Sequence, residues 1–267
     1  MQLPVSGLEV KFRAPDGNDD LAILEATGGV VERALAALPR LARTKEQDNA
    51  GAVNQPSWAA LTVTDFEATL LGLRSFLFGD TVRCLFRDRS HQCVERMELE
   101  FSIAAFLEEV HPAAPRGVRP VEGDRIWFWM TGNDDPGVRF RLPAVDDQVR
   151  VLGERRPAAL LARRCIDAEN IGARRLARIE RAMEALAPLV SRPLKGNCPG
   201  CGQPLTVPLH VPRLVMDELQ KSAAGVYEEV HAIAAAYHWD EAAVLAMPQR
   251  RRRAYAEAIR RRDRAVV

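Results

Sequence analysis

The chain has 267 residues and a mass of 29.6 kDa, which is enough for one large domain or two medium ones with a buried core. Its hydrophobic fraction of 47% and charged fraction of 27% exclude wholesale disorder. Basic and acidic residues nearly balance at a net charge of +1, which excludes a molecule-wide attraction to nucleic acid or membranes. There is no apolar run of membrane-helix length, no secretory signal pattern and no disulfide-scaffold density of cysteine, so we expect a soluble protein from a reducing compartment.

Local patterns in residues 1–110 predict a mixture of strands and helices. Ser6-Gly7 is a turn signal between two apolar runs. Thr64 or Asp65 is the expected cap of a helix that ends at Gly79. The expected elements are a hairpin at 3–15, helices at 21–38 and 66–77, a loop at 43–57, a Cys-bearing segment at 80–93, a strand at 97–101 and a helix at 103–110.

The rest of the chain predicts a linker, a second strand pair and then helices. Residues 111–125 form the expected linker because prolines interrupt them. The elements expected after it are strands at 126–130 and 138–142, helices at 155–165 and 170–187, a Cys turn at 197–202, an alternating strand at 205–211 and helices at 213–238, after Asp240 and from Pro248.

Two matches within the sequence indicate an internal duplication. Residues 10–15 match residues 138–143 at an offset of 128, and the apolar pattern after Cys93 matches the pattern after Cys201 at an offset of 108. The predicted fold is therefore α+β: a duplicated hairpin–helix–zinc-knuckle–strand–helix unit with a helical C-terminal region. The predicted parts are a first half with a degenerate knuckle (1–110), a linker (111–125), a second half with the CPGC knuckle (126–212) and the helical C-terminal region (213–267).

The C-P-G-C-G run from Cys198 to Gly202 is the strongest chemical signal. Gly202 can take the positive φ that lets Cys198 and Cys201 point to one centre, and four thiolates from two such turns bind structural zinc tetrahedrally. A redox C-x-x-C would be followed by a helix, whereas here a strand pattern follows. We therefore predict a structural Zn²⁺ site.

The remaining two zinc ligands come from the first half of the chain. Cys93 is the repeat partner of Cys201, but Ser90 stands opposite Cys198, so Cys84 is the preferred replacement and His91 the alternative. The predicted ligands are Cys84, Cys93, Cys198 and Cys201. Cys165, in an apolar helix, is expected in the core.

An enzymatic interpretation finds little support. Cys93-Val94-Glu95 followed by Cys198 to Cys201 matches a zinc deaminase only superficially, because Asn197 replaces the proline of that motif. Nucleotide-binding, serine-hydrolase and metalloprotease motifs are missing from the sequence, so we expect no catalytic residue and no small-molecule substrate.

The last helix combines aromatic residues with a run of arginines. The expected partner-binding residues are Trp239, Arg250, Arg251, Arg252, Arg253 and Tyr255. The alternative without a binding role is that this helix is a solvated charged face. The second functional hypothesis is a zinc-ribbon protein that binds nucleic acid through this helix.

The segment VYEEVHAIAAAYHWDEAAVLAMPQRRRRAYAEAI, residues 226–259, resembles the C-terminal signature of baseplate or baseplate-hub proteins of contractile-tail phages and phage-tail-like injection systems. NCPGCGQPLTVPL, VRFRLPAVDD and LPVSGLEVKFRAPDG extend the resemblance more weakly. The family carries a C-P-x-C-G in its first half, where this chain has Arg89-Ser90-His91-Gln92-Cys93.

The resemblance implies a non-enzymatic structural or assembly component of the baseplate, near its hub. Its expected partners are other baseplate and tail proteins, without membrane or nucleic acid. Its expected location is the host cytoplasm during assembly and the baseplate of the virion or injection particle.

Overall fold

The computed structural model describes residues 1–45, 57–87, 96–132, 135–168, 170–198 and 201–265. Its contacts divide the chain into two compact units. The sheet unit comprises Met1–Val10 and Thr44–Val211, and the helical unit comprises Lys11–Arg43 and Pro212–Val267. The division falls between Val211 and Pro212, one residue before the predicted boundary, and residues 11–43, expected in the first half, belong to the helical unit. The expected loop at 43–57 falls mostly on residues outside the described ones.

The sheet unit contains a four-stranded antiparallel sheet in the order β5-β6-β7-β8. Its strands are β5 (Val118–Pro120), β6 (Trp127–Gly132), β7 (Asp135–Arg141) and β8 (Ile166–Asp167). The predicted pairing of 126–130 with 138–142 is confirmed, with Phe128 opposite Phe140. Residues 118–120, expected within a linker, instead form the edge strand β5.

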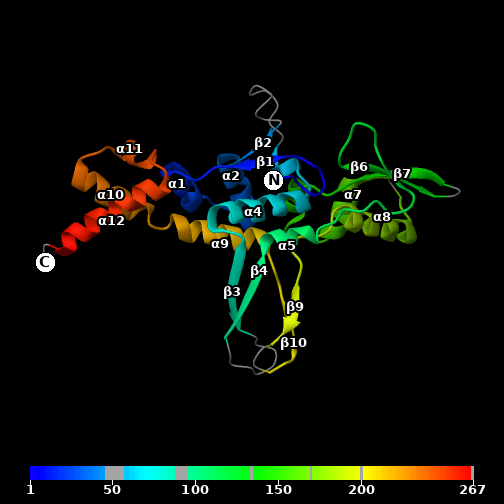
Figure 1. Ribbon diagram of the computed structural model, residues 1–267. Coiled ribbons are helices and arrows are strands. Elements are labelled where there is room, and N and C mark those ends of the chain that lie inside the picture. The colour runs from blue at the N-terminus through cyan, green and yellow to red at the C-terminus, as the bar shows by residue number, and fades with distance from the viewer. Residues whose placement is uncertain (46–56, 88–95, 133–134, 169, 199–200, 266–267) are drawn as a thin grey trace. The chain divides into compact units, whose positions relative to one another are not determined.

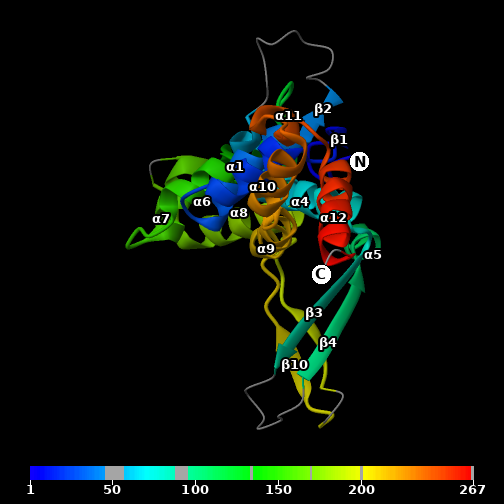
Figure 2. The same cartoon turned by 90° about the vertical axis from the view of Figure 1, so that its left-hand side faces the viewer.

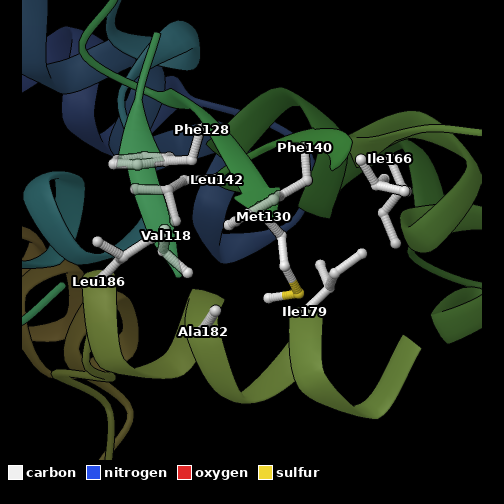
Figure 3. Packing of buried hydrophobic residues seen from close by; sticks show 10 residues of the cluster. Val118, Phe128, Met130, Phe140, Leu142, Ile166, Ile179, Ala182 and Leu186 are labelled. Carbon is white, nitrogen blue, oxygen red and sulfur yellow. The ribbon is translucent and has the colours of Figure 1, made fainter. Parts of the chain in front are cut away.

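Helix α8 (Ala173–Leu186) covers one face of this sheet, and Figure 3 shows the side chains between them. Its buried residues Ile179, Ala182 and Leu186 are three and four positions apart, which places them on one side of the helix. The sheet contributes alternate residues such as Phe128 and Met130, because successive strand side chains point to opposite faces. Each fully buried large side chain contributes about 1.5–3 kcal/mol.

Helix α4 (Val63–Phe78) is buried on nearly all sides within the sheet unit. Gly79, with φ of 90°, ends it as predicted, but its cap is Thr62, whose Oγ1 accepts the Asp65 N–H at 3.2 Å. Asp65 instead accepts the N–H groups of Val5 at 2.8 Å and Ser6 at 2.9 Å. The chain turns back at Ser6-Gly7 as predicted, and Asp65 ties this turn to α4. The predicted hairpin partner is different, because the residues before the turn contribute an isolated bridge, Gln2 with Glu9, and Val10–Phe12 pairs with Ala42–Thr44. The remaining elements here are η1 (Trp58–Ala60), α6 (Val145–Val151) and α7 (Pro157–Cys165).

Two β-hairpins also belong to the sheet unit. One pairs β3 (Thr81–Arg87) with β4 (Arg96–Ser102) and leads into α5 (Ile103–Glu108). The other pairs β9 (Leu194–Asn197) with β10 (Pro204–Val207) and leads into α9 (Val211–Ala223). Figure 1 and Figure 2 show the two hairpins side by side, extending in the same direction. Helices α5 and α9 begin 108 residues apart, the offset of the sequence repeat.

The helical unit is built from helices near both ends of the described chain. These are α1 (Gly17–Glu25), α2 (Val30–Leu41), most of α9, α10 (Val226–Tyr237), α11 (Glu241–Leu245) and α12 (Gln249–Ala265). The single helix expected at 213–238 is two helices, because the chain breaks at 224–225 and Gly225 precedes α10. Asp240 caps α11 as predicted, through the Ala243 N–H at 2.7 Å. Among the described residues, no helix is both long and apolar enough to cross a membrane.

A buried aspartate organises the chain between β1 (Val10–Phe12) and β2 (Ala42–Thr44), which pair with each other. Asp19 closes a capping box with Asp16 at the start of α1. Its carboxylate is held by Arg13 at 2.7 Å and by Arg40 of α2 at 3.1 Å. Two arginines from different segments therefore hold one buried carboxylate.

The same arrangement recurs between β7 and β8. Asp147 accepts the Ala144 N–H at 3.0 Å at the start of α6 and is held by Arg141 at 2.8 Å and by Arg164 of α7 at 2.7 Å. Arg141 and Asp147 follow their counterparts Arg13 and Asp19 by 128 residues. Both segments therefore have strand–helix–helix–strand order with one aspartate clamped by two arginines.

Candidate functional sites

Helices α10, α11 and α12 position the aromatic residues of the C-terminal segment. Their shared core consists of Ile233, Val244, Met247 and Ile259. Helix α10 ends at His238, whose φ of 55° is left-handed and turns the chain before Trp239. The helix packing and this turn bring Trp239 to Tyr255 of α12.

Tyr237, Trp239 and Tyr255 form a compact group that we call the aromatic cluster. Tyr237 stacks on Trp239 with ring centroids 5.1 Å apart, and Tyr255 meets these rings edge-on at 5.8 and 5.4 Å. Tyr237 and Trp239 remain 40% and 37% exposed. The partner-binding residues expected from the sequence included Trp239 and Tyr255 but not Tyr237. Its position at the end of α10, where burial stops, is the signal that distinguishes it.

The arginines of α12 are not equivalent. Arg251 lies over the Tyr255 ring at 5.8 Å, and Arg250 is exposed one residue earlier. Within the described residues, neither has a carboxylate at ion-pair distance. We call these two arginines and the aromatic cluster the aromatic–arginine surface. Arg253 differs, because its guanidinium binds the Ser222 carbonyl and lies 3.6 Å from Glu229.

Arg252 is buried at 1% exposure and does not belong to the surface that sequence reasoning assigned to the whole arginine run. Its Nε donates to Glu229 at 2.8 Å, and its Nη2 pairs with Asp20. Gln249 also donates to Asp20, at 3.0 Å. Burial raises the pKa of Asp20 despite these contacts, of which the Arg252 hydrogen bond is the largest. Arg252 is internal because it shares the buried side of α12 with Ala256.

The predicted zinc turn follows β9 in the sheet unit. The Gly202 N–H donates to the Cys198 carbonyl at 2.8 Å, and the Cys198 N–H donates to the Gln203 carbonyl at 2.8 Å. Gly202 has φ of 72°, as predicted from its place after the second cysteine. Cys198 is buried and Cys201 is exposed. This tight turn at a strand end fits one half of a thiolate zinc site.

Cys84 lies within a strand rather than at a strand end. It pairs with Leu99 three positions before the last described pair, Arg87 with Arg96. Among the described residues, no three His, Cys, Asp or Glu side chains are gathered closely enough to hold a metal ion. Cys93 and the alternative ligand His91 lie outside the described residues, so the four-cysteine site stays a prediction.

A groove of about 470 Å³ lies between the bases of the two hairpins. Its walls include Leu99, Phe101, Phe106, Arg192, Leu194 and Lys195. Arg192 lies over the Phe106 ring at 4.7 Å. Leu99 stands opposite Cys84, and directly opposite residues of a strand pair share a face, so Cys84 belongs to the face that borders the groove.

The base of the second hairpin is anchored to α4 by a buried carboxylate. Glu67 accepts hydrogen bonds from the Ser191 N–H and hydroxyl, both at 2.7 Å. The same hydroxyl accepts the Val211 N–H at the start of α9, at 3.0 Å. Burial raises the pKa of Glu67. Ser191 therefore fixes both ends of the second hairpin, the chain that enters β9 and the start of α9 after β10.

Cys165 is a core residue, as predicted, at 1% exposure. Burial raises the pKa of its thiol to about 11. The thiol is therefore neutral near pH 7, which does not suit a nucleophile.

Comparison with protein-family models, curated proteins and solved structures finds no match to this chain.

Proposed function

We propose that the protein is a non-enzymatic structural or assembly component of a contractile phage-tail-like baseplate, in its hub region, and that it binds other tail proteins. The observation that carries this proposal is the aromatic–arginine surface. Trp, Tyr and Arg are the residues most enriched among those that dominate protein-interface energies. Here they are exposed together on the segment whose sequence resembles the baseplate family.

The proposal includes a duplicated unit in each half of the chain. The equal Arg–Asp clamps at Asp19 and Asp147, and the equal offset of the two hairpin-to-helix junctions, support it. A repeated framework of this kind serves a protein that offers surfaces to several neighbours.

The proposal also includes a structural Zn²⁺ bound by Cys198 and Cys201, with Cys93 and either Cys84 or His91 as the remaining ligands. The turn geometry at Gly202 supports the first pair. When bound, the ion would join the two hairpins, and two-stranded hairpins are only marginally stable alone. Elemental analysis of the purified protein tests this: we expect one zinc per chain, and its absence from protein purified without chelator contradicts it.

Affinity purification tests the partner proposal. The full chain is co-expressed with the tube, sheath and baseplate proteins encoded beside it, and we expect one or more of them to co-purify. Trp239→Ala should reduce recovery at least about fivefold, because a hot-spot side chain contributes 1–2 kcal/mol or more. Tyr227→Ala is the matched control, since Tyr227 is an aromatic residue of the same unit, 53% exposed and outside the cluster. Recovery of no tail protein contradicts the proposal.

A further inference from the structure

We infer that the aromatic–arginine surface binds an acidic segment of a partner protein. An apolar side chain of that segment rests on Trp239 and Tyr237, while its Asp or Glu side chains pair with Arg250 and Arg251. This inference rests on the proposed function and names the chemistry of the partner at the same site.

The aromatic cluster is a platform rather than a cage. Its three ring centroids lie only 5.1 to 5.8 Å from one another, which is direct ring contact. The rings therefore leave no space between them for a ligand cation. A ligand has to lie on the outer side of Trp239 and Tyr237, where an apolar side chain removes exposed aromatic surface from water.

The positive charge beside this platform is specific in position. Arg252 is used internally by Asp20 and Glu229, and Arg253 by the Ser222 carbonyl. Arg250 and Arg251 are exposed, and no carboxylate of the described residues lies at ion-pair distance from them. Arg251 is exposed and lies over the Tyr255 ring at 5.8 Å, and the edge of a guanidinium matches a carboxylate in a bidentate pair.

The surroundings favour a protein segment over nucleic acid. Asp240 and Glu241 are exposed directly after Trp239, and Glu257 is exposed on α12. A nucleic acid carries a charge on every phosphate, so exposed carboxylates on the same segment oppose its binding there. A protein segment can place its carboxylates against the two arginines alone. Duplex DNA is therefore an outcome of the test and not the expected ligand.

Fluorescence anisotropy with a labelled synthetic peptide tests the inference. The probe has a Leu-Phe-Leu centre between Glu-rich ends, and a second probe carries Gln in place of every Glu. We expect the Glu probe to bind the full chain at about 50 mM salt, with affinity that falls as salt rises, and the Gln probe to bind at least about tenfold more weakly.

Charge reversal at two places locates the binding site. We expect the double variant Arg250→Glu, Arg251→Glu to weaken binding of the Glu probe at least about tenfold. The matched control, Arg260→Glu with Arg264→Glu, makes the same charge change on exposed residues further along α12 and should change affinity less than about threefold. Trp239→Ala should weaken the probe with the apolar centre more than an all-Glu probe. Unchanged circular dichroism melting verifies that each variant is folded.

Three results overturn the inference: equal binding of the Glu and Gln probes, equal loss in the two double variants, or stronger binding of duplex DNA than of the Glu probe at equal charge. The proposed function fails separately. If tail proteins co-purify undiminished with the Arg250→Glu, Arg251→Glu variant, the inference fails and the function stands. If the Glu probe binds as expected but no tail protein co-purifies, the proposed function fails and the inferred binding chemistry stands.

Discussion

The Nη1 atom of Arg252 lies 2.7 Å from the point where a Cβ atom on Gly17 would stand. The Cα atom of Leu245 lies 2.8 Å from the same point. Nη1 has no hydrogen-bond partner in the described structure, so it is held there by packing and by the contacts of the other guanidinium nitrogens. The start of α1 therefore accepts only glycine against the backbone of α11.

Gly17→Ala should destabilise the helical unit by about 1–3 kcal/mol, because the new methyl group overlaps a backbone atom as well as a flexible side chain. Hydrogen–deuterium exchange should show faster exchange in α1, α11 and α12. Gly196→Ala is the control, since a Cβ there meets no atom within 4 Å. Equal exchange in Gly17→Ala and the unmodified chain would contradict the packing described here.

Arg252→Met should be far more damaging than Arg250→Met, although the two residues are adjacent members of one arginine run. Removing Arg252 takes the nearest counter-charge from the buried Asp20 and Glu229, leaving Glu229 with the more distant Arg253, and breaking a buried ion pair typically costs about 3–5 kcal/mol. Arg250 is exposed, and its replacement should lie within about 0.5 kcal/mol of neutral. Denaturant unfolding, monitored through hydrogen–deuterium exchange in α10 and α12, measures the loss of stability in each variant. Similar losses in the two variants would contradict the burial of Arg252.

The Asp147 clamp should make a pH-dependent contribution to stability. Burial raises the pKa of Asp147, but hydrogen bonds from Arg141, the Ala144 N–H and Arg164 outweigh it and hold the pKa well below its ordinary value. A carboxyl with a lowered folded pKa stabilises the fold fully above its unfolded pKa, about 3.9, and loses that contribution as pH falls toward the folded pKa.

Asp147→Asn should therefore cost about 1–3 kcal/mol at pH 7, and this difference from the unmodified chain should shrink below about pH 4. Urea unfolding at pH values from 3 to 7 measures it. Asp146→Asn is the control, because the Asp146 carboxylate is exposed and pairs with Arg150 at the surface. A difference that grows as pH falls would show that the sign assigned to the clamp is wrong.

Thiol labelling should separate Cys201 from Cys165. Cys201 is exposed, whereas Cys165 is buried with its pKa raised to about 11, so few of its thiols ionise. Iodoacetamide at pH 7.5 should modify Cys201 in the native metal-free protein and reach Cys165 only on unfolding, as read by peptide mass spectrometry. Added Zn²⁺ should protect Cys201 if the proposed site forms. Labelling of both residues at equal rates contradicts the burial of Cys165.

Sequence patterns predicted the local structure where one residue decides it. Ser6-Gly7, Gly79 and Gly202 each ended or turned the chain as expected, because a left-handed or turn conformation selects glycine from local sterics alone. The 128-residue offset marked the two matching segments, although helix α6 (Val145–Val151) was not among the expected elements. These features depend on residues close together in the sequence.

Contacts between distant segments were not predictable in this way. The arginine run gave no sign that Arg252 alone faces inward, because its partner Asp20 lies 232 positions away. The break before Gly225 was hidden by apolar spacing that continues through it. Strand β5 was concealed by prolines, which an edge strand tolerates because its outer N–H groups need no partner.

The helical unit has a consequence for the order of folding during synthesis. Helices α1 and α2 leave the ribosome long before α10 and α12 are synthesised. Asp20 therefore cannot pair with Arg252 until nearly the whole described chain has been translated. The segment Thr44–Val211 emerges complete in the meantime and can condense first. Docking of α12 is then the step that seals the carboxylate away from water, and a nascent chain stalled before it would present α1 and α2 to chaperones.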